Sequence, residues 1–581
     1  MLTAQNNLSK YSIVFTGFIS LVIIYFFVWR VGTTGYHTVI DGDARDYYSY
    51  LKAIFIDKNL GHQDTTPWYI IQTPTGTINV HTAGVSLLLF PFFLIGYVWA
   101  SWFGYEVNGL SEPFEKMVSV GALFYALLGL YFIRKLLLKL NIKDSIIAAT
   151  LLLIYFGTHL LNYSLNEPAM SHVYSFSIIS AFFYFSYQVF NSGERKYFVY
   201  AALALGLIIL IRPINGIVLG IVPFWSYSFK EFIERMRIIF FQKTKTMVIA
   251  GLVFKLTILI QGFIWLVQNG KMMQWSYKDN GLYFFSPNTL KMLFGFNAGF
   301  FIYTPVCLLL MFGFVPLFKE NSYKFMALFL FLLFVFYLFS CHWAYTYFDG
   351  LSIRPMVDLM PVFAILAAKL MTSVQGKLKT VTVPALGLLL VLNLVTCYQY
   401  KAGILPAASM NYEKFKYIFL KTDKKYAGVL GGCNDLLPYS KHHPEKSFSY
   451  ENPLGEKEIF NYTDRVFGLA YHIPAIGFNS SKIYIKASLQ RKESVKNSSA
   501  NSCIVFNIES TTGGKTREHV VKLNDVPSET CCSWQKWNYN ITIDDGVKAT
   551  DKLTVFVWNP EKQNFLVRDF KVEVYDYNYK E

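Results

Sequence analysis

The sequence predicts a polytopic α-helical membrane protein with a separate all-β domain at its C-terminal end. Up to about residue 400, the chain is a series of apolar runs separated by short polar loops. Charged residues make up only 16% of the chain, whereas soluble domains carry about 25%. From about residue 456 the pattern changes to short alternating runs bounded by turn signals. We therefore predict a transmembrane domain over 1–400 and a β domain over 401–581.

The apolar runs predict about 11–13 membrane spans. The first run, Tyr11–Trp29, is long enough to cross a hydrocarbon core of about 30 Å. No signal-peptidase site follows it, so we interpret it as an uncleaved helix. The candidate spans are roughly 12–30, 81–103, 115–133, 144–162, 172–191, 196–211, 213–228, 246–268, 297–317, 323–341, 355–372 and 380–398.

Loop charge orients these spans. The loops at 134–143, 194–196, 230–245, 319–324 and 369–379 hold 16 Lys and Arg residues, and those at 163–171, 212, 269–296 and 342–354 hold five. The positive-inside rule places the first set and the N-terminus in the cytoplasm. The loop 32–80 and the β domain are then extracytoplasmic.

This scheme requires that 81–103 does not cross the membrane as a simple span. A rival scheme lets 81–103 cross and joins 196–228 into one span, which places Arg212 near the bilayer centre at high cost. We prefer the first scheme. It gathers the polar segments on one face, covered by the β domain, as an enzyme with an extracytoplasmic site requires. The net charge of +15 follows this loop pattern, so we do not expect nucleic-acid binding.

The first loop holds three carboxylates within six residues, Asp41, Asp43 and Asp46, together with Arg45. An acid at the membrane edge can act as the general base for an acceptor hydroxyl. The structural alternative is a solvated turn in which Asp41 or Asp43 caps a helix that begins near Ala44. We favour the catalytic role, and Asp43 over Asp41.

Three further residues enter apolar runs from the same face. His81 opens one run, where it is either an interfacial residue or part of a site. Glu167 lies beside Pro168, which can begin a helix, and His172 follows one to two turns later. Glu167 either stabilises the helix N-terminus through the helix dipole or forms a site with His172.

Two arginines are candidates for binding a phosphate. Arg212 precedes Pro213 and divides a long apolar stretch into two short runs. A guanidinium at the tip of such a hairpin can bind phosphate with two hydrogen bonds, or extend to lipid headgroups. Arg354 and Asp358 are four residues apart and could pair on one helix face, or Arg354 could contact the substrate.

In the C-terminal domain, alternating runs predict strands at Lys482–Ala487, Cys503–Ile508, Val520–Leu523, Trp537–Ile543, Leu553–Val557 and Phe570–Val574. Their spacing indicates an antiparallel β-sandwich that resembles a jelly roll. Its tryptophans serve core packing or sugar stacking. Its four cysteines allow a Cys433–Cys503 bridge, or one that involves Cys531 or Cys532.

The ordered motifs together resemble bacterial members of the GT-C superfamily of membrane glycosyltransferases. These motifs are Asp41–Tyr50, His81–Gly96, Glu167–Phe176, Arg212–Asn215, Asn297–Pro305 and Gly350–Pro361. Distant members are the aminoarabinose transferases of lipid A and the protein O-mannosyltransferases. The resemblance implies a polyprenyl-phosphate sugar as donor and an acid of the first loop, Asp43 or Asp41, as base. It implies that Arg212 and Arg354 bind the carrier phosphate, while His81, Glu167 and His172 surround donor and acceptor.

We therefore predict an inverting glycosyltransferase that acts on a glycan, lipid or protein at the extracytoplasmic face. No nucleotide-binding, zinc or serine-hydrolase motif occurs, and nothing specific supports a divalent metal. The alternatives are a transporter or flippase of a lipid-linked sugar, and a non-catalytic scaffold whose sandwich binds sugar. Against a transporter, the Arg-Pro-Ile-Asn break has no second copy.

Overall fold

The protein is represented by a computed structural model, in which the chain divides into two compact units with a boundary between Cys397 and Tyr398. We refer to them as the membrane unit and the sandwich unit. The structure describes residues 7–29, 39–40, 42–63, 65, 70–73, 76–274, 276, 281–347, 350–407, 410–423, 426, 446–449, 459–494, 502–510, 517–523, 532–543 and 546–576.

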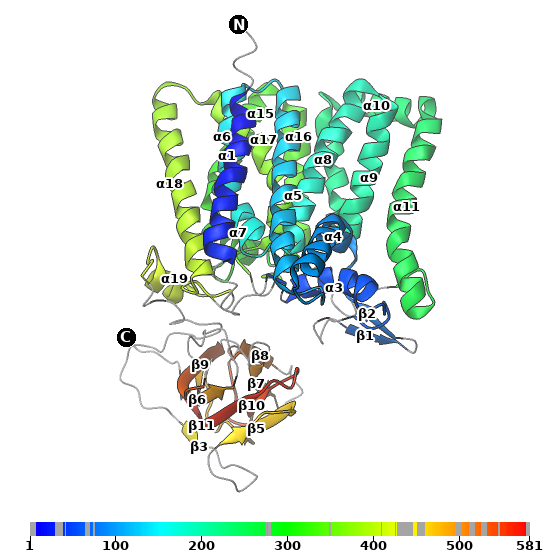
Figure 1. The fold of residues 1–581 in the computed structure, drawn as a ribbon. Coiled ribbons are helices and arrows are strands. Elements are labelled where there is room, and N and C mark those ends of the chain that lie inside the picture. The colour runs from blue at the N-terminus through cyan, green and yellow to red at the C-terminus, as the bar shows by residue number, and fades with distance from the viewer. Residues whose placement is uncertain are drawn as a thin grey trace. The chain divides into compact units, whose positions relative to one another are not determined.

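The membrane unit is a bundle of helices with one small hairpin (Figure 1). Eight of the described helical segments are long and apolar enough to cross a membrane, as expected of a polytopic membrane protein. The elements are α1 (Leu8–Ile23), η1 (Ile24–Trp29), α3 (Asp43–Phe55), β1 (Ile70–Thr73), β2 (Gly76–Asn79), α4 (Gly84–Phe103), α5 (Glu112–Lys139), α6 (Asp144–Phe156), α7 (Leu160–Leu165), α8 (Ser171–Ser192), α9 (Arg195–Ile211), η3 (Pro213–Trp225), α10 (Phe229–Arg237), η4 (Ile238–Gln242), α11 (Thr244–Asn269), α12 (Thr289–Phe294), α13 (Phe300–Tyr303), α14 (Pro305–Leu310), η5 (Met311–Gly313), α15 (Phe314–Glu320), α16 (Ser322–Ser340), η6 (Arg354–Leu359), α17 (Met360–Ser373) and α18 (Gly376–Lys401).

Two of the predicted spans are interrupted. The run 297–317 is divided among α13, α14, η5 and α15, because Pro305 can begin a helix but cannot continue one. The run 144–162 is divided between α6 and α7 at Gly157. Short segments of this kind are tolerated in a membrane protein where neighbouring helices cover them.

Helix α4 lies obliquely at one end of the bundle, beside α3 (Figure 1). Helices α5 and α8 start at this end and run in parallel, because Tyr125 contacts Tyr174 and the Tyr187 hydroxyl donates to the carbonyl of Lys139. Near its start, α4 approaches the last residues of α9, which returns to the same end. Its Gly96, further along, approaches the first residues of α5.

All these contacts of α4 with α5 fall on the first half of α5, from Pro113 to Tyr125. Helix α4 is also among the eight segments that are long and apolar enough to cross a membrane, so our interpretation that 81–103 does not cross stays a prediction.

Gly84 lets α4 approach α9 at this end. A Cβ atom at Gly84 would lie 2.4 Å from the carbonyl oxygen of Leu210, a backbone atom that cannot rotate away. We expect Gly84→Ala to destabilise the membrane unit by about 1–3 kcal/mol, as overpacking does. Thermal unfolding in detergent measures this. The matched control is Gly251→Ala in α11, where a Cβ atom meets nothing within 4 Å. Equal melting temperatures for the two variants would contradict the packing argument.

The sandwich unit consists of two antiparallel sheets. One has the strand order β5-β10-β7-β8 and the other β3-β11-β6-β9, with β4 also paired to β11. This order is that of a jelly roll, so the predicted architecture is confirmed. After the short helix α19 (Tyr412–Ile418), the strands are β3 (Lys446–Ser449), β4 (Phe460–Asn461), β5 (Phe467–Ile473), β6 (Ile483–Glu493), β7 (Cys503–Glu509), β8 (Arg517–Lys522), β9 (Gln535–Ile543), β10 (Lys552–Trp558) and β11 (Phe565–Asp576).

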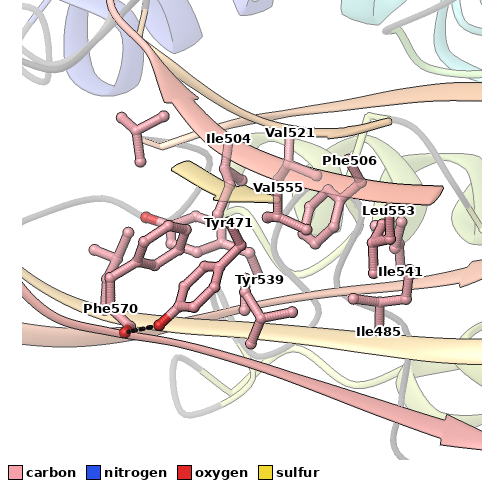
Figure 2. Packing of buried hydrophobic residues seen from close by; sticks show 14 of the residues in the cluster. Tyr471, Ile485, Ile504, Phe506, Val521, Tyr539, Ile541, Leu553, Val555 and Phe570 are labelled. Carbon is pink, nitrogen blue, oxygen red and sulfur yellow. Dashed lines mark hydrogen bonds between the residues drawn. The ribbon is translucent and has the colours of Figure 1, made fainter. Parts of the chain in front are cut away.

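Alternate residues of these strands form the core between the sheets. In Figure 2, Phe506 and Val555 of one sheet lie across from Ile485 and Ile541 of the other. This period of two is the pattern from which the strands were predicted. The core also encloses one polar link between the sheets, because the Tyr471 hydroxyl donates to the Phe570 carbonyl at 2.8 Å.

Of the two disulfides that the sequence allows, the Cys433–Cys503 bridge is not observed. Cys503 is not part of a disulfide, and its buried side chain packs as a small apolar group on β7. The alternative is confirmed for Cys532, which is disulfide-bonded. Cys433 and Cys531 lie outside the described residues.

Candidate active site

Four element ends meet at the end of the bundle where α4 lies. Helix α3 begins at Asp43, where Gly42 adopts a left-handed φ of 59° that favours glycine. Helix α9 ends at Ile211, because Arg212 precedes a proline and is therefore extended. Helix α8 begins at Ser171 and η6 at Arg354. Contacts between their side chains connect these ends into one cluster.

Asp43 and Arg354 form the most direct of these contacts. An Arg354 guanidinium nitrogen lies 2.6 Å from a carboxylate oxygen of Asp43, and the two side chains are 12% and 15% exposed. The contact joins residues more than 300 positions apart and brings the two candidates together. Asp43 is the first residue of α3 and Gly42 occupies the N-cap position, so Asp43 is not the N-cap residue that the structural alternative requires. Asp41 lies outside the described residues.

Asp358 is the most buried acid of the cluster, with 0% exposure. Its Oδ1 lies 2.8 Å from His172 Nδ1, and its Oδ2 accepts a hydrogen bond from the Asn215 amide at 2.7 Å. The same Oδ2 is 3.8 Å from Arg212 Nε. Arg212 and His172 therefore share the Asp358 carboxylate.

The suggested pairing of Arg354 with Asp358 is thus not the one observed. Both residues lie in η6, a 3₁₀ helix. With three residues per turn, positions four apart point in directions about 120° apart rather than along one face. Arg354 is directed to Asp43, and Asp358 to Arg212 and His172.

The suggested partnership of Glu167 with His172 is also not observed, because the His172 ring hydrogen-bonds Asp358 instead. Glu167 is half-buried in the turn that precedes α8, where it acts electrostatically on Tyr163. It stays a candidate for substrate binding at the edge of the cluster.

Tyr47 is a buried side chain that the sequence analysis did not select. Its hydroxyl contacts Ser171, and the charges of Arg212, Asp43 and Arg354 all act on it. Burial raises the pKa of Tyr47, so the phenol keeps its proton at neutral pH. Tyr47 therefore places a hydrogen-bond donor among the three charged candidates.

Asp46 and His81 hold α3 in place next to this cluster. Asp46 is fully buried, and its Oδ2 is 3.4 Å from His81 Nδ1. The centroids of the His81 and Tyr47 rings lie 4.4 Å apart. The backbone carbonyl of His81 accepts a hydrogen bond from the Tyr50 hydroxyl at 2.6 Å. Arg45 is half-buried in the first turn of α3. Asp46 and His81 thus orient Tyr47, and their direct contact with substrate stays a prediction.

His342 extends the cluster from the loop after α16. Its ring stacks on Tyr347 at 4.6 Å. Burial, together with the positive charges of Arg212 and Arg354, lowers the pKa of His342 to about 4. The imidazole is therefore neutral at physiological pH.

This neutral histidine predicts a pH effect on stability. Between about pH 6.5 and 4 the unfolded chain binds a proton at His342 that the folded chain does not, so stability falls as the pH falls. We expect wild type to lose about 1–2 kcal/mol relative to His342→Gln between pH 7 and 5. Thermal unfolding in detergent at the two pH values measures the difference. Parallel losses in both proteins would contradict it.

The site combines a carboxylate, two guanidinium groups, a phenol and a neutral imidazole. This arrangement can accept a proton at Asp43 and bind an anion through the arginines. Among the described residues, no group of three His, Cys, Asp or Glu side chains is placed to hold a metal ion.

No protein-family model matches the chain, and no curated protein matches it. Two similar solved structures are ArnT from Cupriavidus metallidurans, bound to undecaprenyl phosphate, and the arabinosyltransferase EmbB from Mycobacterium smegmatis. ArnT is 13% identical, with 70% of this chain and 68% of ArnT covered, at a TM-score of 0.44. EmbB is 12% identical, with 85% of this chain and 64% of EmbB covered, at a TM-score of 0.31. The match therefore spans less than two thirds of EmbB.

Because both TM-scores lie below 0.5, we base the functional proposal on the geometry of the site.

Proposed function

We propose that this chain is an inverting glycosyltransferase that moves a sugar from a polyprenyl-phosphate carrier to a hydroxyl of a glycan, lipid or protein. We place the reaction at the extracytoplasmic face. One observation carries the proposal: Asp43, Arg354 and Arg212 belong to one cluster at one end of a membrane-helix bundle. An acid paired with one guanidinium group, with a second guanidinium in the same cluster, suits a reaction that removes a proton and releases a phosphate.

In this mechanism Asp43 is the general base. It takes the proton of the acceptor hydroxyl as that oxygen forms a bond to the anomeric carbon of the donor sugar. The bond from the same carbon to the phosphate oxygen breaks, and the polyprenyl phosphate leaves with the bonding electrons. Attack opposite to the leaving group inverts the anomeric configuration.

The arginines stabilise the charge of the leaving phosphate. Arg354 is paired with Asp43 in this structure, so a phosphate that binds Arg354 competes for it and frees the carboxylate to act as base. Arg212 also acts electrostatically on Tyr47 and is held by Asp358 and Ser171. The polyprenyl-phosphate carrier is what the family resemblance implies.

The test uses the full chain in lipid nanodiscs with a panel of polyprenyl-phosphate pentoses and hexoses. We expect sugar transfer without any nucleotide sugar, and NMR of the product should show the inverted anomeric configuration. Retention of configuration, or activity only with nucleotide sugars, would refute the proposal.

The same experiment in sealed vesicles distinguishes the glycosyltransferase from the transporter or flippase alternative. A glycosyltransferase consumes the donor and releases polyprenyl phosphate. A flippase moves the donor to the other leaflet and leaves it intact, so donor recovered unchanged after translocation would favour that alternative.

A further inference from the structure

The Asp358 side chain is buried deeply in the cluster. It is neither the general base nor a phosphate-binding group in the proposed mechanism. It has 0% exposure and lies in an apolar part of the chain. A buried carboxylate is stable only if its oxygens are paired and hydrogen-bonded. The partners of Asp358 come from α8, from η3 and from the junction before η3.

The hydrogen bonds of Asp358 fix the orientation of His172. Because Oδ1 of the carboxylate accepts, we assign the ring proton to His172 Nδ1. His172 Nε2 is then left with a lone pair, and it lies 3.4 Å from Arg212 Nη1. The imidazole therefore connects the buried acid to the guanidinium.

Three protein side chains contact the Arg212 guanidinium. His172 Nε2 and Ser171 Oγ both face its Nη1, the latter at 3.3 Å, while Asp358 Oδ2 faces its Nε at 3.8 Å. The Arg212 side chain is 14% exposed. Protein groups thus fix the guanidinium at two of its nitrogens, Nε and Nη1.

We infer that Asp358 and His172 form a buried pair that positions Arg212 to bind the phosphate of the lipid-linked donor. Neither residue contacts the donor. The inference rests on the proposed function, because it assigns a phosphate to Arg212. Preorganised donors bind an anion more tightly than mobile ones, since their ordering entropy is already lost.

The test measures binding of farnesyl phosphate, a short polyprenyl phosphate, to the full chain in nanodiscs. Farnesol, which lacks the phosphate, is measured in parallel. We expect Arg212→Gln and Asp358→Asn each to weaken farnesyl phosphate binding about 10- to 100-fold, the worth of one hydrogen bond to a charged group. Farnesol binding should not change. The double variant should bind no more weakly than Arg212→Gln, because both changes remove the same contact.

Two further variants keep the test decisive. His172→Gln breaks the link between Asp358 and Arg212 at its middle, so it should reproduce Asp358→Asn, and it replaces that variant if Asp358→Asn does not fold. Ser175→Ala is the matched control. It removes a 3.2 Å hydrogen bond to Asn215 that does not involve Arg212, so binding should stay at the wild-type level.

The outcomes separate the two proposals. The positioning role is overturned if Arg212→Gln binds farnesyl phosphate weakly while Asp358→Asn and His172→Gln both bind it normally. The proposed function is not affected by that result. The positioning role is also overturned if the double variant binds farnesyl phosphate more weakly than Arg212→Gln, or if farnesol binding weakens as much as farnesyl phosphate binding. Normal binding by Arg212→Gln overturns the assignment of the phosphate to Arg212, and the inference with it.

Discussion

Asp43→Asn is expected to lower the rate of sugar transfer by about 100- to 10,000-fold, the usual contribution of a general base. The amide has nearly the shape of the carboxylate but cannot accept the proton of the acceptor hydroxyl. It can still accept a hydrogen bond from Arg354 through its oxygen, so the variant should fold. Initial rates of polyprenyl phosphate release, with donor and acceptor saturating, measure the loss in kcat.

Asp57→Asn is the matched control for this variant. Asp57 follows the same helix and also pairs with a cation, because its carboxylate lies 2.8 Å from Lys52 Nζ. That pair is more exposed and remote from the cluster, so its loss should leave the rate unchanged. Asp41→Asn decides the alternative that the sequence leaves open. Full activity of Asp43→Asn with loss in Asp41→Asn would move the base to Asp41.

Arg354→Gln is expected to lower kcat/KM for the donor by about 100- to 1,000-fold, as the loss of a donor that stabilises developing charge does. Two effects contribute. The leaving phosphate loses a guanidinium, and Asp43, which is 15% exposed, loses its cation. Arg354→Lys should recover part of the activity, because it restores the charge without the two-pronged geometry. Transfer rates over a range of donor concentrations measure these effects.

Lys52→Gln is the control for Arg354→Gln, since it removes the cation of the exposed Lys52–Asp57 pair. An exposed pair contributes less than about 1 kcal/mol, so neither activity nor stability should change measurably. If Arg354→Gln transferred sugar at the wild-type rate, Arg354 would be only the structural partner of Asp43.

Much of the fold is predictable because its patterns are local. A run of about 20 apolar residues indicates a span wherever it lies, and alternation within six residues indicates a half-buried strand. The strands β6 to β11 are predictable for this reason, whereas β3, β4 and β5 are not among the runs named from the sequence. The interruption at Arg212 and Pro213 was found because proline restricts the residue before it.

Pairings across the site are a different matter, because they join residues far apart in the chain. The sequence suggested Arg354 with Asp358 and Glu167 with His172, both of which are short-range pairs. The structure instead pairs Arg354 with Asp43 and His172 with Asp358. Tyr47 also became a candidate only through its neighbours from other helices.

By itself, the sequence determined that the chain is a polytopic membrane protein with a jelly-roll-like domain, and which polar segments share one face. These properties follow from local hydrophobic periodicity and loop charge. Only the tertiary structure decided that α4 lies at the end of the bundle, which acid accompanies Arg354 and which orients Arg212. Helix packing and the 3₁₀ geometry of η6 set the direction of each side chain, and neither is encoded in any single stretch of residues.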